Sequence, residues 1–250
     1  MFSRLLTALV ILIGLSPPVA ADALNEARQD YIDGNYQAAL AVLEPMARSG
    51  NATAQNIMGA AYEAGHGVGP DPEKARAWYE QAAAQGLAKA DYNLGLLHKK
   101  AGRYDGAVMA FEAAMALDYG AAFYERGKML RYGIGGPVLS AQAAAAFERG
   151  LNLGNAPAGV ELAEMHRLGE GMPQDAAKAR GLYQAAAISG NAVALGNLAL
   201  MYETGLGGVQ DHAAAYALYQ QAVARGDENA VKNLAAFRQN TKDTAGYWLD

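Results

Sequence analysis

The sequence predicts an all-α protein built as an α-solenoid of stacked antiparallel helix pairs, with about six repeats of 36 residues, two of them shortened to about 32. Turn glycines recur at a fixed spacing, and buried-type aromatic residues recur at the same spacing. Between the glycines the chain is rich in Ala, Leu, Met, Glu, Gln and Lys, which are good helix formers. A period of this length is typical of repeat architectures.

The glycine and aromatic spacings agree along the chain. The turn glycines are separated by 36, 68, 36 and 36 residues, where 68 corresponds to one full and one shortened repeat; they are Gly50, Gly86, Gly154, Gly190 and Gly226. The aromatic residues are separated by 32, 36, 36 and 36 residues; they are Tyr79, Phe111, Phe147, Tyr183 and Tyr219. The agreement predicts the same structural unit in successive segments.

Each unit is expected to contain two helices, as in residues 51–64 and 71–85. Asn51 follows Gly50, so one helix ends at a residue that tolerates positive φ and the next begins with a side-chain cap. The same Gly-Asn or Gly-Asp order recurs at 154–155, 190–191 and 226–227. One such pair cannot bury its apolar face alone, so neighbouring pairs are expected to stack.

Glycine pairs lie between the two helices of a unit, at Gly65/Gly67, Gly133/Gly135, Gly169/Gly171 and Gly205/Gly207. The first pair resembles a phosphate-binding loop, which would indicate a nucleotide site. It follows a helix rather than a strand, however, and no Lys-Ser/Thr pair accompanies it. The pattern therefore predicts turns.

Residues 1–21 predict a secretory signal peptide. The apolar run of residues 5–15 is too short to cross a hydrocarbon layer, which takes about 20 helical residues. Val19 and Ala21 are small residues where a signal peptidase reads them, so cleavage is expected after Ala21. We expect an exported protein, periplasmic or secreted, with no integral membrane span after signal removal. Residues 22–237 should form the solenoid with a C-terminal capping helix, and 238–250 a tail.

Composition and motifs argue against several kinds of chemistry. The absence of Cys excludes disulfides, thiolate metal sites and cysteine nucleophiles, and a net charge of −5 disfavours nucleic acid as the main partner. The four histidines lack metal-ligand spacing. Glu161 and Glu164 share a helix face, but helix surfaces commonly carry such pairs. We therefore expect no metal, no cofactor and no catalytic residues.

Two histidines, His98 and His166, occupy the helix position that is Tyr62 or Tyr202 in other units. This position packs one helix against the next, so both histidines are expected to be hydrogen-bonded packing residues. A pH-sensing role is the alternative.

Cationic residues gather in the central units, at positions of the first helices. They are Lys99, Arg126, Lys128, Arg131 and Arg167. If these positions face a groove, they would form a cationic strip suited to an acidic peptide or a carboxylate. An ordinary solvated helix face explains the same charges, and the sequence leaves both explanations open.

The motifs also carry a family resemblance. Residues 51–86 contain Ala54, Met58-Gly59, Tyr62, Gly65-x-Gly67-Val68, Asp71, Lys74-Ala75, Trp78-Tyr79, Ala82-Ala83 and Gly86, and residues 191–226 repeat most of this pattern. The pattern resembles the Sel-1-like repeat family, which is related to tetratricopeptide repeat proteins, in an exported bacterial form. Residues 87–118 and 33–39 are similar to tetratricopeptide units, and 119–154 is a degenerate unit with Arg126 where leucine is usual.

The resemblance implies a right-handed superhelix whose first helices line a concave face that holds other proteins. We therefore expect a non-catalytic scaffold or adaptor in the cell envelope that regulates a signalling or assembly partner, as similar periplasmic proteins restrain the sensor domain of a histidine kinase. The alternative is a repeat enzyme that binds or hydrolyses β-lactams or cell-wall fragments. Those relatives carry paired cysteines, which this chain lacks. The oligomeric state is not predicted.

Overall fold

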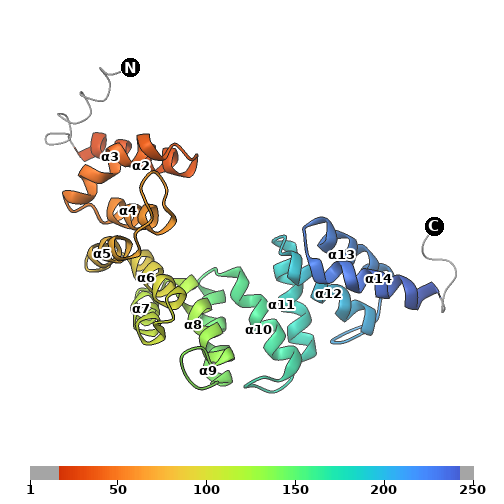
Figure 1. Cartoon of the computed structure of the whole chain (residues 1–250). Coiled ribbons are helices and arrows are strands. Elements are labelled where there is room, and N and C mark those ends of the chain that lie inside the picture. The colour runs from red at the N-terminus through yellow and green to blue at the C-terminus, as the bar shows by residue number, and fades with distance from the viewer. Residues whose placement is uncertain (1–16, 243–250) are drawn as a thin grey trace. The chain divides into compact units, whose positions relative to one another are not determined.

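A computed structural model describes residues 17–242 of the chain, and all regular elements in this range are α-helices (Figure 1). The expected signal segment is outside this range up to residue 16, and so is the end of the expected tail, 243–250. The described helices are α2 (Pro17–Ile32), α3 (Tyr36–Arg48), α4 (Ala52–Ala64), α5 (Pro72–Ala83), α6 (Ala88–Lys100), α7 (Tyr104–Ala116), α8 (Gly120–Tyr132), α9 (Ser140–Asn152), α10 (Ala156–Leu168), α11 (Ala176–Ile188), α12 (Ala192–Thr204), α13 (His212–Ala224) and α14 (Glu228–Lys242).

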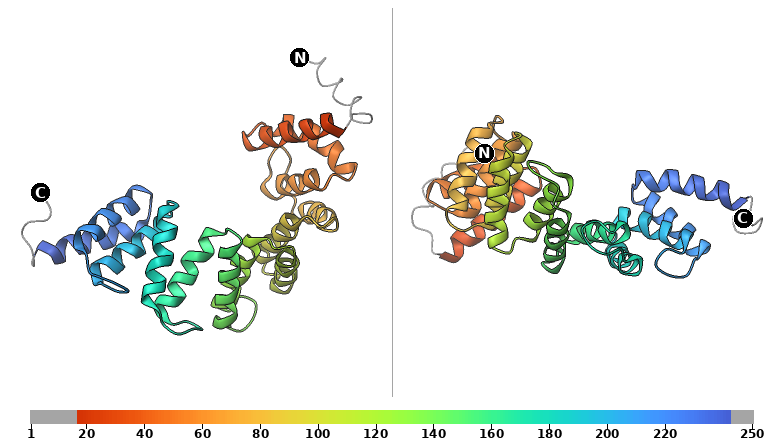
Figure 2. Two further views of the ribbon diagram at one scale, coloured as in Figure 1. Left: turned by 180° about the vertical axis from the view of Figure 1, so that it is seen from behind. Right: turned by 90° about the horizontal axis from the view of Figure 1, so that it is seen from below.

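The chain divides into two units, one ending at Tyr119 and the other starting at Gly120. In each unit successive helices form antiparallel pairs, which confirms the predicted α-solenoid class (Figure 2). We call the first helix of a pair helix A and the second helix B. Unit 1 contains the pairs α2/α3, α4/α5 and α6/α7; unit 2 contains α8/α9, α10/α11 and α12/α13, followed by α14. Within a unit, each helix B also packs on the next helix A.

Capping groups set the helix boundaries as predicted. The Asn51 side chain accepts a hydrogen bond from the Ala54 amide at 2.9 Å, and Asp71 accepts one from the Lys74 amide at 3.0 Å. The same caps recur at Asn155, Asp175, Asn191 and Asp211. The expected turn glycines adopt positive φ. Asp118, with φ of 55°, occupies the position that the glycine series skips, so the turn is kept without glycine.

The second glycine of the helix A to helix B loop has a packing role as well as a turn role. Gly67 has φ of +71°, and a Cβ built on it would lie 2.9 Å from the Tyr36 Cβ of α3. The Gln37 side chain also donates a hydrogen bond to the Gly67 carbonyl at 2.8 Å. The loop of one pair therefore docks on helix B of the preceding pair, which confirms the predicted turn geometry.

In the five pairs from α4/α5 to α12/α13, the core is an aromatic ring of helix B packed against a small residue of helix A, and in α3 the buried Leu43 takes the place of the ring. The predicted aromatic series is at most 1% exposed at all five positions. Gly59 lies under the Tyr79 ring so closely that a Cβ there would be 2.6 Å from it. Gly95 and Gly127 lie in the same way under Phe111 and Phe147. The corresponding positions in the last two pairs are the fully buried Ala163 and Ala199.

Both ends of the described chain are helical. Helix α2 begins at Pro17, so the expected cleavage position after Ala21 falls within its first turns. Helix α14 continues to Lys242, into the segment 238–250 that we assigned to a tail. In residues 17–242, no helix has the length and hydrophobicity needed to cross a membrane.

The ring-to-glycine contact gives a stability prediction. Replacing glycine by alanine normally stabilises a helix by about 1 kcal/mol. For Gly59→Ala we expect the opposite, a loss of about 1–3 kcal/mol in the free energy of unfolding, because the added Cβ overlaps the Tyr79 ring.

Gly181→Ala is the matched control, because Gly181 lies in α11 and a Cβ there would meet nothing within 4 Å. Urea denaturation followed by circular dichroism should show this variant equal to or more stable than wild type. Equal stabilisation by both substitutions would contradict the proposed role of the contact.

Candidate functional site

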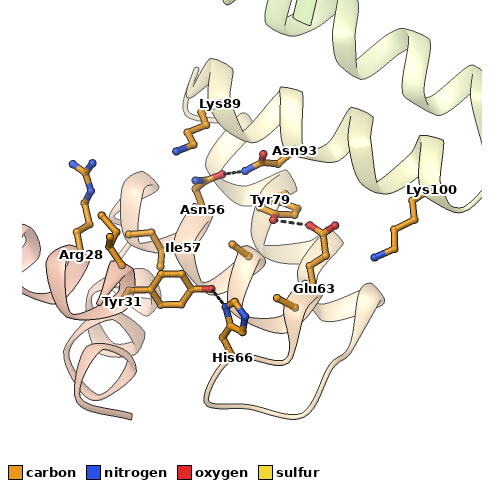
Figure 3. A pocket seen from close by; sticks show the side chains of 13 residues that line it. Arg28, Tyr31, Asn56, Ile57, Glu63, His66, Tyr79, Lys89, Asn93 and Lys100 are labelled. Carbon is orange, nitrogen blue, oxygen red and sulfur yellow. Dashed lines mark hydrogen bonds between the residues drawn. The ribbon is translucent and has the colours of Figure 1, made fainter. Parts of the chain in front are cut away.

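A groove of about 560 Å³ opens on the helix A face of unit 1, between α2, α4 and α6 (Figure 3). Its buried and half-buried lining comes from α4, mainly Asn56, Ile57 and Ala60. Its exposed rim carries the cations Arg28, Lys89 and Lys100. The stacking of helix pairs creates this groove, because each pair contributes its helix A to the same face.

The groove is positively charged although the chain is acidic. Its lining contains three cations and one carboxylate, Glu63. Among residues 17–242, Arg28, Lys89 and Lys100 form no ion pair with another side chain. A groove of this kind attracts negatively charged groups.

Glu63 is held in place by the core. The buried Tyr79 hydroxyl donates a hydrogen bond to Glu63 Oε2 at 2.9 Å. Burial, followed by the charge of Glu63, raises the pKa of Tyr79 far above its usual value, so the hydroxyl remains a donor. Glu63 therefore has a structural partner in the core of its own pair.

An asparagine pair crosses the groove lining. Asn93 Nδ2 of α6 donates a hydrogen bond to Asn56 Oδ1 of α4 at 2.8 Å. Asn56 is only 6% exposed, which makes it one of the few buried polar side chains. The pair still carries the amide N–H groups of Asn56 and the carbonyl of Asn93, which suit the main chain of a bound peptide.

Aromatic residues form one wall of the groove. The Tyr31 hydroxyl lies 3.1 Å from His66 Nδ1, within hydrogen-bonding distance, and the Tyr36 ring stacks on His66 with centroids 4.3 Å apart. Burial, with smaller contributions from Tyr36 and Glu63, raises the pKa of Tyr31 to about 12. These contacts hold the loop after α4 against α2 and α3, so this wall is preformed.

The cations predicted from the sequence lie on three helices. Lys99 is half-buried on α6 in unit 1. Arg126, Lys128 and Arg131 lie on α8, and Arg167 lies on α10, all in unit 2. The structure thus groups the cations of α8 and α10 in one unit, and Lys99 is described with the other.

Arg131 holds two helix pairs together. Its side chain is 8% exposed, and it forms ion pairs with Glu161 Oε2 at 2.6 Å and Glu170 Oε2 at 2.7 Å. Burial acts to lower the Arg131 pKa, but the bonds to both carboxylates outweigh it and raise the pKa above its usual value. Arg131 therefore stays charged and links α8 to α10 and the loop that follows α10.

The other unit 2 cations also have neighbouring carboxylates or interactions within the chain. Arg167 binds Glu164 at 2.6 Å, and Glu164 also accepts a hydrogen bond from the buried Tyr183 hydroxyl at 2.6 Å. Lys128 Nζ lies 4.0 Å from Glu125 and 5.0 Å from the centroid of the Tyr124 ring. The binding of a partner by Lys99, Arg126, Lys128, Arg131 and Arg167 stays a prediction.

A relation between the two helices of a pair, which the sequence analysis missed, explains much of this charge pattern. Where helix B has a buried tyrosine, helix A supplies a glutamate that accepts its hydroxyl hydrogen bond. Where helix B has phenylalanine, no acceptor is needed, and helix A carries a cation at the position of Glu63. The Tyr183 pair differs, because Arg167 occupies that position and the acceptor Glu164 lies three residues earlier. The tyrosine pairs are Tyr79–Glu63, Tyr183–Glu164 and Tyr219–Glu203, and the phenylalanines with their cations are Phe111 with Lys99 and Phe147 with Arg131. Comparing the aromatic series with the residues at the position of Glu63 in the sequence would have revealed the Tyr79–Glu63 and Tyr219–Glu203 pairs but not the Tyr183–Glu164 pair.

His98 and His166 pack between helices, but one part of their predicted role is wrong. Nδ1 of both is buried without a hydrogen-bond partner. Burial lowers the pKa of both from 6.5, and nearby cations add to this effect, Arg103 and Arg76 at His98 and Lys178 at His166. Both therefore act mainly as neutral packing groups. Among residues 17–242, no cluster of His, Asp and Glu could hold a metal ion.

Comparison with known proteins connects this geometry to a family. A family model described as Sel1 repeat matches residues 52–87, 157–191 and 192–227. The tetratricopeptide-like segment 33–39 precedes the first match, and nearly all of the tetratricopeptide-like segment 87–118 and the degenerate unit 119–154 lie between the first and second matches. A sel1-like repeat-containing protein of Acanthamoeba polyphaga mimivirus is 31% identical over 78 residues, which is 31% of this chain and 15% of the relative.

Two solved structures are similar along most of the chain. The Sel1 repeat protein from Oxalobacter formigenes is 28% identical, with 85% of this chain and 89% of that protein aligned at a TM-score of 0.78. A protective antigen of uropathogenic Escherichia coli strains, described as displaying an SLR fold, is 30% identical, with 78% of this chain and 42% of the antigen aligned at a TM-score of 0.72.

The contribution of the Arg131 ion pairs to the free energy of unfolding can be tested. Arg131→Met should lower the free energy of unfolding by about 2–3 kcal/mol, less than for a fully buried pair because Glu161 and Glu170 are 20% and 35% exposed. Arg48→Met is the control, since the Arg48–Glu44 pair is 69% and 43% exposed, and it should change stability by less than about 0.5 kcal/mol. Adding Glu161→Gln and Glu170→Gln to Arg131→Met should restore part of the loss. Equal effects of the Arg131 and Arg48 substitutions in urea denaturation would rule out this role.

The two histidines predict a pH dependence of stability. Because their pKa is lowered on folding, the unfolded chain binds more protons, and stability falls as pH drops below 6.5. Glu164, whose pKa is lowered mainly by its hydrogen bond with Arg167, loses its contribution only below the usual value of 4.5, outside this window. Thermal unfolding from about pH 7.5 to 5.5 should show a decrease in Tm that is smaller in His98→Tyr/His166→Tyr, which copies Tyr62 and Tyr202. An unchanged slope in this variant would contradict the assignment.

Proposed function

This chain belongs to the Sel1 repeat family, and we propose that it is a non-catalytic scaffold that binds a protein or peptide partner in the α2/α4/α6 groove. The observation that carries the proposal is the groove itself: three helices present a preformed, charged surface whose rim cations are not used within the described chain. The one carboxylate in the lining, Glu63, is engaged by Tyr79. The lining therefore suits recognition of a surface better than acid–base chemistry.

We propose further that the protein works in the cell envelope as an adaptor for a signalling or assembly partner. The support is the signal-like pattern of residues 1–21, with cleavage expected after Ala21. The alternative of an enzyme acting on β-lactams or cell-wall fragments gains no support from the matched family model or from the similar structures. It also lacks the paired cysteines of such relatives.

The predicted cations of unit 2, which are Arg126, Lys128, Arg131 and Arg167, form a second proposed contact region, and Lys99 of unit 1 stays a separate prediction. Lys128 is 30% exposed on α8, which leaves part of its side chain open to a partner. Arg131 contributes by holding α8 and α10 together rather than by a free charge.

Crosslinking in the host cell tests the proposed function. Ala64 lines the groove and is exposed, so Ala64→Trp should fill the groove without changing charge. We expect mass spectrometry of the envelope fraction to show one dominant crosslinked partner for the wild type and its loss in Ala64→Trp. The chain recovered there should have a mass that corresponds to a start at Asp22.

Gly181→Trp is the matched control, because Gly181 is exposed on a helix B and meets nothing within 4 Å. This variant should keep the partner. If both tryptophan variants keep the same partner, the groove is not the binding site.

A further inference from the structure

The exposed cations of unit 1 fall into two groups by their ion pairs. Away from the groove, cations are paired with carboxylates of the same unit; the pairs are Arg48–Glu44, Lys74–Asp71, Arg76–Glu73, Arg76–Glu80 and Arg103–Glu73. Arg28, Lys89 and Lys100 line the groove and form no ion pair within residues 17–242. In a chain with five more acidic than basic residues, three cations gathered in one groove without ion pairs make a local positive surface that complements a negatively charged partner.

We infer that the α2/α4/α6 groove recognises an extended acidic peptide segment, with two carboxylate side chains about five residues apart that bind the Lys89 and Lys100 ends of α6. This inference deepens the proposed function and depends on it. It names the class of partner: a protein segment whose side-chain carboxylates complement the groove rim.

The spacing follows from helix and strand geometry. Lys89 and Lys100 lie near opposite ends of α6, eleven residues apart, and Figure 3 shows Lys100 across the groove from Lys89 and Arg28. At 1.5 Å per residue the two positions are about 16 Å apart along the helix. An extended peptide rises about 3.3 Å per residue, so about five residues cover this distance.

The groove between the two ends suits a peptide main chain with small or apolar side chains. Ile57, Ala60 and Ala64 contribute apolar side chains to the lining between the two ends. The Asn56–Asn93 pair lies in the same lining and offers both a donor and an acceptor. The combination predicts an acidic residue, a small or apolar centre and a second acidic residue.

A nucleic acid fits the groove less well. A phosphate backbone places a negative charge at every nucleotide, whereas the lining places Glu63 between its cations. A peptide can place carboxylates only at the two ends and so avoids Glu63. We therefore favour the peptide, and an oligonucleotide serves as a competitor in the test.

Peptide display on the full chain tests the inference. Random twelve-residue peptides would be selected on the wild type, and the selected peptides synthesised with fluorescein for anisotropy measurements. We expect selected peptides to carry Asp or Glu pairs four to six positions apart. Replacing both acids by Asn or Gln should weaken binding about fivefold, and raising NaCl from 50 to 300 mM should weaken it further.

Two charge-reversal variants locate the site. Lys89→Glu/Lys100→Glu should weaken binding at least about tenfold. Lys178→Glu/Lys232→Glu changes the net charge equally at exposed positions of unit 2 and should stay within about twofold. All four positions are exposed, so these variants should keep the circular dichroism spectrum of the wild type.

The outcomes separate the inference from the proposed function. Suppose that the selected peptides bind the Ala64→Trp variant weakly but carry no acidic pairs, or bind Lys89→Glu/Lys100→Glu as tightly as the wild type. Either result would overturn the acidic-segment inference and leave the groove as a binding site. Peptides that bind Ala64→Trp as well as wild type, or no selected peptides, would overturn both. A twelve-nucleotide single-stranded DNA that binds the groove more tightly than the selected peptides would also overturn the inference.

Discussion

The contact between an aromatic ring of helix B and a small residue of helix A is the constraint on which the other features depend. It brings the two helices of a pair so close that Gly59, Gly95 and Gly127 leave no room for a Cβ. Because the contact recurs in five successive pairs, and the buried Leu43 replaces the ring in α3, every helix A presents the same side to the same face of its unit. The groove of unit 1 is a consequence of this repetition, since α2, α4 and α6 each contribute equivalent positions to it.

The chemistry of the ring also influences the charge of the face. A buried tyrosine hydroxyl needs an acceptor, and Glu63, Glu164 and Glu203 supply it. A phenylalanine needs none, which leaves room for a cation such as Arg131 on helix A. In unit 2 such charges stabilise the stack through Arg131 and its two glutamates. In unit 1 the cations of the groove rim form no ion pairs that join helices, and we therefore propose partner recognition there.

Charged side chains at helix A positions thus have two different roles in this chain. The charge of Arg131 and its two glutamates holds neighbouring pairs in place, whereas the rim cations of the unit 1 groove form no ion pair in residues 17–242 and are the ones we propose for recognition. Sequence position does not separate the two kinds, because Lys100 and Arg131 are both cations near the end of a helix A. Burial and ion pairs separate them: Arg131 is 8% exposed between two carboxylates, whereas Lys100 is exposed at the groove rim.

The sequence by itself determined the helix pairs, their turns and caps, and the aromatic core, because local rules govern these features. Turns with positive φ favour glycine, and the free amides at a helix start need a capping side chain. The fixed repeat period places the same face of each helix in the core. Only the tertiary structure decided how charges from different helices meet. Arg131 and Glu170 are 39 positions apart in the sequence, and Asn56 and Asn93 are 37 apart, so no local signal predicts either contact, since each depends on the stacking of two pairs. The groove appeared for the same reason, as a property of three packed helices and of no single segment.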